Sequence, residues 1–232
     1  MTCKNILFLF CFVFCAVFSE AKDLIWKEDF NNTVVKGDKA FPRNWYSKSM
    51  TFLSPCTDFF IEKIEGKNVL KVYSDKASGL FMYNLSGIVD LNKTPILRWR
   101  WKALKLPPGA DGRGQKKDDQ AVAIYVGAGT IMYRTIAYRW ETETPKGTEE
   151  NVSFGTTSIK WYCIRNKTDS LEKWYVEEKN IAADFKKAYG FIPDKFIISI
   201  AGNSQYTKSK SEALVDWIEF VPPPPPGLTL NK

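Results

Sequence analysis

Short runs rich in β-branched and aromatic residues recur along the chain, and clusters of Gly, Pro, Asn and Asp separate them. Such runs are typical of β-strands, because branched and aromatic side chains fit a pleated surface. Many strands at this spacing predict an all-β fold, either an antiparallel jelly roll or a β-sandwich. The expected strands are residues 24–30, 59–64, 69–74, 80–85, 96–102, 121–126, 131–140, 158–165, 174–179, 196–201 and 213–220.

One segment has a helical pattern instead. Asn180 can cap a helix, Ile181 and Phe185 then fall on one face, and Gly190 can end it. We therefore expect one short helix, which covers an end or an edge of the sandwich.

The two ends of the chain differ from its middle. Lys4 precedes an apolar run over residues 6–18, and Ser19-Glu20-Ala21 supplies small residues at the two positions that a signal peptidase needs. This predicts a signal peptide at residues 1–21, with an uncleaved anchor as the alternative. Residues 22–221 then form one β-sandwich domain without a transmembrane segment. Residues 222–232 form a proline-rich tail, since proline donates no ladder hydrogen bond.

Composition excludes several functions. The chain has no histidine, which rules out Ser-His-Asp and Cys-His catalysis and any His-ligated zinc site. The net charge is +7, but Lys and Arg are interleaved with acids and the basic runs are short, so we expect no nucleic-acid partner. Any chemistry would use carboxylates, Tyr, Lys or Arg, with a hard cation at most.

Two of the five cysteines, Cys56 and Cys163, lie beyond the expected signal peptide. In an oxidising compartment they can form a disulfide. The alternative is two reduced thiols. Cys163 alternates with Ile159 and Trp161, as a small core residue would.

An alternation of aromatic and charged residues marks the middle of the chain, at Arg98-Trp99-Arg100-Trp101. Alternate residues of a strand share a face, so the two Trp point one way and the two Arg the other. A structural network of ion pairs is one interpretation. A ligand face is the other, because a flat ring beside fork-shaped donors and carboxylates suits a sugar. The predicted ligand-binding residues are Arg98, Arg100, Asp118, Asp119, Tyr138 and Trp140.

A cation site is a further possibility. Asp29 lies in the first expected strand and Asp216 in the last. Where the terminal strands of a sandwich are neighbours, their carboxylate oxygens can hold a structural calcium. Ordinary edge-strand charge is the alternative, and no other cofactor is expected.

The order of several short motifs resembles a known family. They are Leu97-Arg98-Trp99-Arg100-Trp101, Leu106-Pro107-Pro108-Gly109, Asp118-Asp119, Ala137-Tyr138-Arg139-Trp140, Pro145-Lys146-Gly147-Thr148 and Asp216-Trp217-Ile218-Glu219-Phe220. Together they resemble a bacterial family called domain of unknown function 3047. The resemblance implies an exported, periplasmic or secreted β-sandwich and carries no established activity. Residues 202–207 depart from the Asp-rich turn that is common in the family.

Three functions are compatible with these patterns. The leading hypothesis is a non-catalytic, exported jelly-roll module that binds a carbohydrate or a cell-envelope polymer. The first alternative is a polysaccharide lyase or hydrolase. The second is an envelope assembly subunit with a protein partner.

Overall fold

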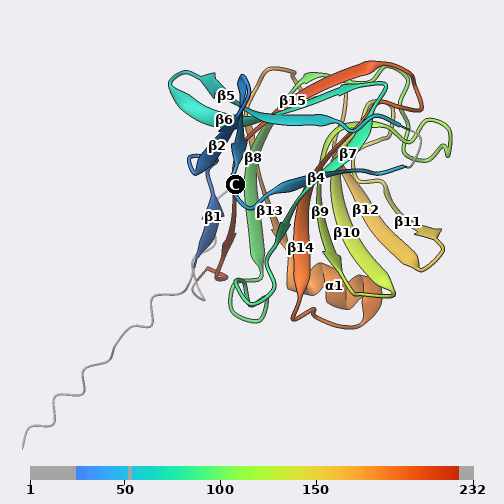
Figure 1. Cartoon of the computed structure of the whole chain (residues 1–232). Helices are drawn as coiled ribbons and strands as arrows, with labels where there is room; N and C mark the ends of the chain where they lie inside the picture. The colour runs from blue at the N-terminus through green and yellow to red at the C-terminus, as the bar shows by residue number, and fades with distance from the viewer. Residues whose placement is uncertain (1–24, 52–53, 225–232) are drawn as a thin grey trace, which may run out of the picture.

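Two β-sheets packed face to face, with one helix, make up the computed structural model, which describes residues 25–51 and 54–224 (Figure 1). Sheet A has the order β13 (Tyr175–Asn180), β8 (Ile96–Lys105), β15 (Lys210–Val221), β6 (Lys67–Asp75), β5 (Asp58–Ile64), β3 (Lys39–Pro42) and β2 (Thr33–Lys36), with β1 (Trp26–Glu28) beside β15. Sheet B has the order β11 (Glu149–Phe154), β12 (Thr157–Arg165), β10 (Tyr133–Trp140), β9 (Gln120–Ala128), β14 (Phe196–Asn203), β7 (Ser78–Asn84) and β4 (Tyr46–Ser49).

The all-β sandwich with one short helix is confirmed. The strand pairs are antiparallel except for β10 and β12, which are parallel. The hairpin of β11 and β12 allows this exception, because β11 carries the chain back to the end of the sheet where β10 begins. Four strands were not predicted, namely β2, β3, β4 and β11, which are short and mostly lie at sheet edges.

The core lies between the two sheets and is rich in aromatic rings. Trp99 and Trp101 project from sheet A, and Tyr138 and Trp140 meet them from sheet B. The ring centres are 5.5 Å apart for Trp99 and Tyr138 and 5.6 Å apart for Trp101 and Trp140. Burial of side chains of this size contributes roughly 1.5–3 kcal/mol each, so this aromatic layer is a principal stabilising contact between the sheets.

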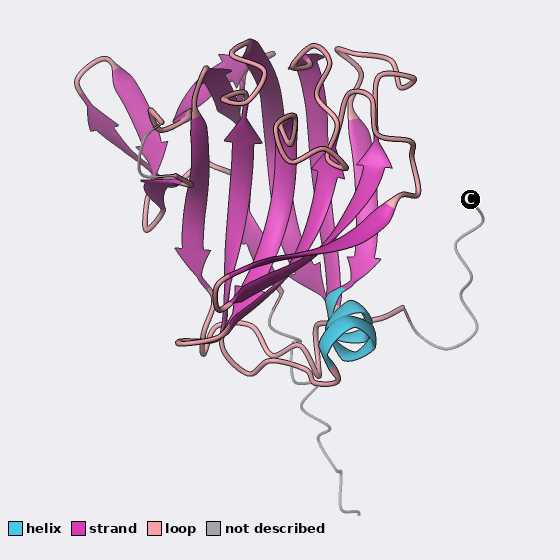
Figure 2. Ribbon diagram, turned by 90° about the vertical axis from the view of Figure 1, so that its right-hand side faces the viewer, coloured by secondary structure: helices cyan, strands magenta, loops and turns pink. Residues whose placement is uncertain are grey.

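The helix α1 (Ile181–Tyr189) forms where its capping residues predict it. The Ala183 amide donates to Asn180 Oδ1 over 2.9 Å, and Gly190 ends the helix with a φ of 81°. The Tyr189 hydroxyl donates to the Thr135 carbonyl over 2.8 Å. Figure 2 shows the helix at one end of the strands, where it closes the sandwich.

The predicted signal peptide and most of the proline-rich tail lie outside the described residues. Within the described ranges, no helix is both long and apolar enough to cross a membrane.

Candidate functional site

Tyr138 and Trp140 do not lie on a ligand-binding face. Both are buried between the sheets, at 1% and 0% exposure. The prediction placed them on one face with Arg98 and Arg100, and this is wrong. Because alternate residues of a strand share a face, Tyr138 and Trp140 point to the same side of sheet B. That side is the interior, where their rings pack against Trp99 and Trp101 of sheet A.

Arg98 and Arg100 lie on the outer face of sheet A. Arg100 Nη1 is 2.5 Å from Asp216 Oδ2, and Arg98 Nη1 is 3.2 Å from Glu219 Oε1. Asp118 and Asp119, with which the sequence could also pair these arginines, lie directly before β9 of the other sheet. The ion-pair network therefore exists with different carboxylates, and it lies apart from the rest of the predicted site.

The two adjacent aspartates have separate surroundings. Asp119 is fully buried and accepts from the amide of Tyr206 over 3.1 Å and from the amide and hydroxyl of Thr207 over 2.7 Å each. It holds the turn that follows β14. Asp118, in the loop before β9, instead contacts Arg139 of β10 and keeps part of its carboxylate in solvent.

The carboxylates expected to hold calcium have other partners. β1 does pair with β15, so the terminal strands are neighbours as expected. Asp216 forms its ion pair with Arg100, and Asp29 accepts from the Asn31 amide over 3.2 Å. Within the described residues, no group of three or more acidic or cysteine side chains is arranged to hold a metal ion.

Cys56 and Cys163 are both free thiols, which agrees with the alternative of two reduced thiols and not with the disulfide. Cys56 is exposed, whereas Cys163 is buried on β12. The Cys163 Sγ–H donates to the carbonyl of Thr144 over 3.5 Å. Burial raises the pKa of the Cys163 thiol to about 12, which keeps it protonated and unreactive.

The outer face of sheet B is the stronger candidate for a functional site. In each strand of sheet B, every second side chain points to this outer face; in β10 these are the neighbours of Tyr138 in sequence. A second, smaller apolar cluster lies in the middle of the face. The strand registers place Trp161, Ala137, Tyr125 and Ser199 in one row across four neighbouring strands. Small residues thus alternate with aromatic rings along this row.

A buried polar cluster closes one end of this face. Arg139 is 3% exposed and lies between Asp118 and Glu141, with its Nε 3.0 Å from Glu141 Oε1. Its Nη2 donates to Gln120 Oε1 over 2.7 Å. Its guanidinium carbon lies 4.8 Å from the ring centre of Trp161. A planar guanidinium suits this combination of paired carboxylates and a stacked ring.

Glu141 is sealed by the loop before β9. Its carboxylate accepts from the Gly112 amide and from the Thr144 hydroxyl, both over 3.1 Å. A Cβ on Gly112 would lie 2.9 Å from Glu141 Oε1, so only glycine fits there. Burial raises the pKa of Glu141 to about 7, against the opposing effect of Arg139. Glu141 therefore positions Arg139 and does not reach a ligand.

The opposite end of the face carries exposed rings. Tyr133 is 43% exposed and Phe154 is 62% exposed. Tyr133 and Phe154 are both register partners of Thr157, so they flank the same position of β12. Tyr46, at the β4 edge of the sheet, is 48% exposed and has the same parity.

The turn between β9 and β10 adds two more apolar side chains beside Tyr133. Ile131 and Met132 are 79% and 61% exposed. Gly129 has a φ of 116°, and a Cβ on it would lie 2.1 Å from the Met132 carbonyl oxygen. The turn therefore requires glycine to hold these side chains outward.

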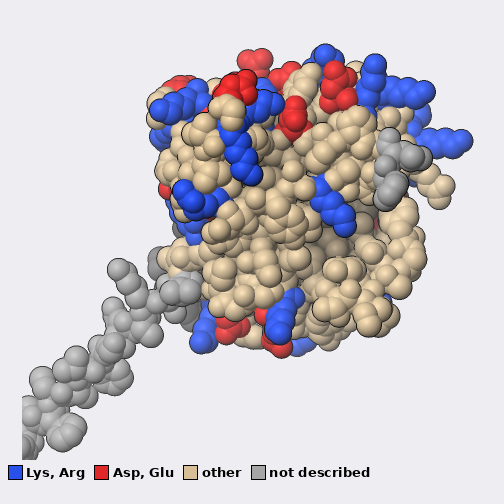
Figure 3. Space-filling model, viewed as in Figure 1, with Lys and Arg blue, Asp and Glu red and all other residues tan. Residues whose placement is uncertain are grey.

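Charge is scarce in the middle of the side seen in Figure 3. Lys, Arg, Asp and Glu gather along its upper and lower edges and its left flank, and the surface between them is mostly uncharged. This surface is hollowed on its right half, where a Lys or Arg side chain lies beside the hollow. This hollow lies where β9, β10 and β12 run in Figure 1. The residues of the middle row are themselves at most 7% exposed, so the exposed apolar side chains lie at the end of the face, at residues 131–133 and Phe154. Neighbouring exposed apolar side chains mark interaction sites more often than random surface does.

The sequence signal for these residues was weak. Arg139 lies inside one of the family motifs. In the sequence, its position next to Tyr138 shows only that the two side chains point to opposite faces of the sheet. Tyr133 and Phe154 become neighbours only through β11, whose sequence Glu-Glu-Asn-Val-Ser-Phe does not read as a strand.

An all-β sandwich with one capping helix and an aromatic outer sheet face is the class that fold and site define. The chain matches the family described as "protein of unknown function (DUF3047)" over residues 43–219, and it belongs to that family.

Comparison with known proteins adds distant likenesses. A xyloglucanase domain of NopAA from Sinorhizobium fredii is 10% identical with a TM-score of 0.46, covering 83% of this chain and 96% of that one. A cellulase derived from Cel12A of Rhodothermus marinus is 11% identical with a TM-score of 0.42, covering 75% and 95%. The CBM22-1 xylan-binding domain of Paenibacillus barcinonensis Xyn10C is 11% identical with a TM-score of 0.36, covering 78% and 88%. No curated protein matches the chain.

Proposed function

We propose that this protein binds a carbohydrate chain across the outer face of sheet B. The observation that carries the proposal is the set of exposed rings, Tyr46, Tyr133 and Phe154, on one sheet face. Aromatic rings offer a flat apolar partner for the C–H face of a sugar. Neighbouring strands lie about 4.8 Å apart, so rings on different strands can contact successive sugar units of an extended chain.

The polar end of the face supplies orientation. Trp161 is 1% exposed and lies against Arg139, so it supports this end of the face from within. Asp118 presents a partly exposed carboxylate that can accept from hydroxyl groups. A sugar provides the hydroxyl donors that this carboxylate requires.

The charge of this end favours a neutral ligand. The cation of Arg139 is already matched by Asp118 and Glu141. A negatively charged sugar would therefore find no unmatched cation at Arg139 itself. We expect neutral glycans to bind more tightly than uronic-acid polymers of similar length.

A binding role is favoured over the hydrolase alternative. Glycoside hydrolysis requires two carboxyl groups that flank the scissile bond and reach the ligand. Glu141 is fully buried under Gly112, so only Asp118 of this pair is reachable. The exported location belongs to the same proposal and rests on residues 1–21.

A thermal-shift screen of the chain from Lys22 onward, with neutral and acidic oligosaccharides, tests the proposal. A ligand that binds only the folded state must raise the melting temperature. We expect a saturable rise with a neutral glycan, and its loss in Tyr133→Ala/Phe154→Ala. A rise of equal size in that variant would refute the assignment of this face.

A further inference from the structure

A pocket opens at one edge of the sandwich, between the hairpin of β2 and β3 in sheet A and the edge strand β4 of sheet B. It has a volume of about 460 Å³, within the range of roughly 300–1,000 Å³ that is usual for small-molecule sites. Its lining includes Val34, Lys36, Phe41, Arg43, Trp45 and Phe81. Both sheets contribute, since β3 belongs to sheet A and β7 to sheet B.

The apolar floor of the pocket is rigid. Trp45 and Phe81 stack with ring centres 5.0 Å apart and an interplanar angle of 15°. Trp45 Nε1 donates to Glu28 Oε2 over 2.9 Å, which fixes the indole from behind the stack. A floor held by packing and a hydrogen bond is preorganised for a flat or apolar ligand.

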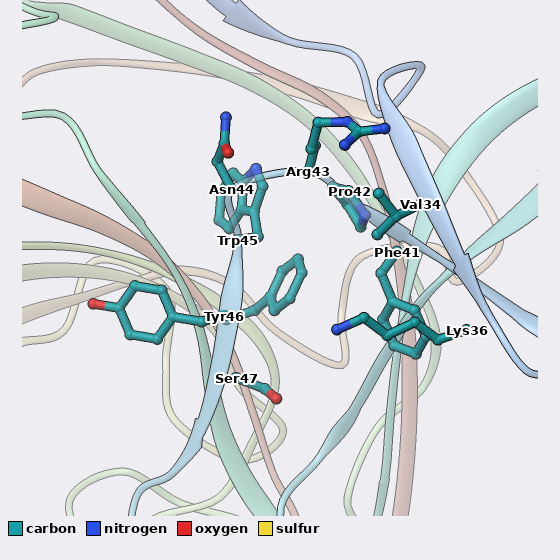
Figure 4. A pocket seen from close by; sticks show the side chains of 10 residues that line it. Val34, Lys36, Phe41, Pro42, Arg43, Asn44, Trp45, Tyr46 and Ser47 are labelled. Atoms are coloured by element: carbon teal, nitrogen blue, oxygen red, sulfur yellow. The ribbon is translucent and has the colours of Figure 1, made fainter.

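The cations of the pocket lack carboxylate partners. Lys36 and Arg43 line it, and none of the Asp and Glu residues that the structure describes does. In the described part of this hairpin, Lys39 forms an ion pair with Asp58, whereas neither Lys36 nor Arg43 forms one. Figure 4 shows the Lys36 ammonium directed toward the middle of the pocket, with the Tyr46 ring directed away from it.

Arg43 is held at the rim by the turn before β4. Its amide donates to the Asn32 carbonyl over 2.8 Å, and its Nε donates to Asn32 Oδ1 over 3.2 Å. Asn44 follows with a φ of 67°, a left-handed conformation that Asn tolerates. The two outer nitrogens of the Arg43 guanidinium are left for a ligand, and a guanidinium binds a carboxylate through two parallel bonds.

We propose that this pocket binds a small carboxylate with an apolar body, whose carboxylate contacts Lys36 and Arg43 and whose body lies against Val34, Phe41 and the exposed part of Trp45. Tyr46 borders both this pocket and the outer face of sheet B, but its ring points away from the pocket, so this proposal does not depend on the carbohydrate proposal. The body can be an aromatic ring or an aliphatic chain, because the floor accepts either.

Calorimetric titration with matched probe pairs tests the site. The aromatic pair is 3-phenylpropionate and 3-phenylpropanol, and the aliphatic pair is octanoate and 1-octanol. We expect the acid of at least one pair to bind about tenfold more tightly than its alcohol, which corresponds to about 1.4 kcal/mol. The better acid identifies the body. Equal affinities within both pairs, or no heat from either acid, would overturn the proposal.

Variants locate the binding. Lys36→Gln/Arg43→Gln should remove the preference for the acid, whereas Lys63→Gln, on the exposed surface of β5, should retain it. Because both changes are at exposed positions, the melting temperature should stay within a few degrees of wild type. Backbone NMR shifts should move in β2, β3 and β4 on adding the acid. Shifts confined to other strands, or an unchanged preference in the double variant, would contradict this site.

Discussion

The guanidinium carbon of Arg139 lies 4.8 Å from the ring centre of Trp161, on the outer face of sheet B. Asp118 and Glu141 bind the same guanidinium from either side. This arrangement neutralises a buried cation and sets the floor of the proposed binding face. It also makes Arg139 a residue whose removal has a large structural cost.

Replacing Arg139 with Met should destabilise the protein by about 3–5 kcal/mol, because Glu141 would be left buried without its cation. Urea unfolding measures this. Arg139→Met/Glu141→Leu should recover part of the loss, since both charges are then gone. A double variant as unstable as the sum of the two single variants would show that the pair is not coupled.

Stability should fall as the pH rises from 4.5 to about 7, the interval between the ordinary pKa of Glu141 and its raised pKa in the folded state. Across this interval the folded state holds a proton that the unfolded chain releases, so the free energy of unfolding decreases. Glu141→Gln should show a flatter dependence than wild type over the same interval. Parallel curves for the two proteins would mean that Glu141 does not titrate there.

Asp119→Asn should cost more stability than Asp118→Asn. Asp119 accepts three hydrogen bonds from Tyr206 and Thr207 while fully buried, and bonds to a charged acceptor contribute roughly 1.5–3 kcal/mol each at most. Asp118 keeps solvent contact, and Asn at that position can still accept from Arg139. The urea midpoints of the two variants measure this difference in stability. Equal midpoints would show that the hydrogen bonds of Asp119 to the turn after β14 do not stabilise the protein more than the contact of Asp118 does.

The chain from Lys22 onward should react with a thiol reagent at one fast site and one slow site. Cys56 is exposed, whereas Cys163 is buried with a pKa of about 12. Cys56→Ser should therefore abolish the fast phase, and Cys163 should react only when the protein is unfolded. A folded protein without any reactive thiol would indicate that the two cysteines are bonded after all.

The sequence predicted the sandwich and the helix because their signals are local. Asn180 and Gly190 bracket the helix, and the alternation of Arg98-Trp99-Arg100-Trp101 correctly sends the two Trp into the core. The candidate site was harder, because both faces of sheet B carry apolar residues. Alternation alone could not show whether Tyr138 or Arg139 faces the interior.

The exposed rings were beyond reach of the sequence for a different reason. Phe154 comes beside Tyr133 only because β10 and β12 pair in parallel and β11 folds back on β12. The parallel pairing of β10 with β12, which are connected through β11, has no local sequence signal. The sequence could not decide between a disulfide and two thiols for a similar reason, since the distance between Cys56, in the loop before β5, and Cys163, in β12, depends on how the two sheets pack.

The most direct test of the central claim is affinity electrophoresis in gels that contain neutral polysaccharides. Three proteins are compared, namely wild type, Tyr133→Ala/Phe154→Ala and the control Leu171→Ala/Val176→Ala. The control also removes two exposed apolar side chains, but on sheet A: Val176 lies in β13 and Leu171 in the segment before it. We predict that at least one polysaccharide retards wild type and the control, and that the Tyr133→Ala/Phe154→Ala protein migrates as it does without polysaccharide. Equal retardation of all three, or retardation of none by any polysaccharide, would contradict carbohydrate binding at the outer face of sheet B.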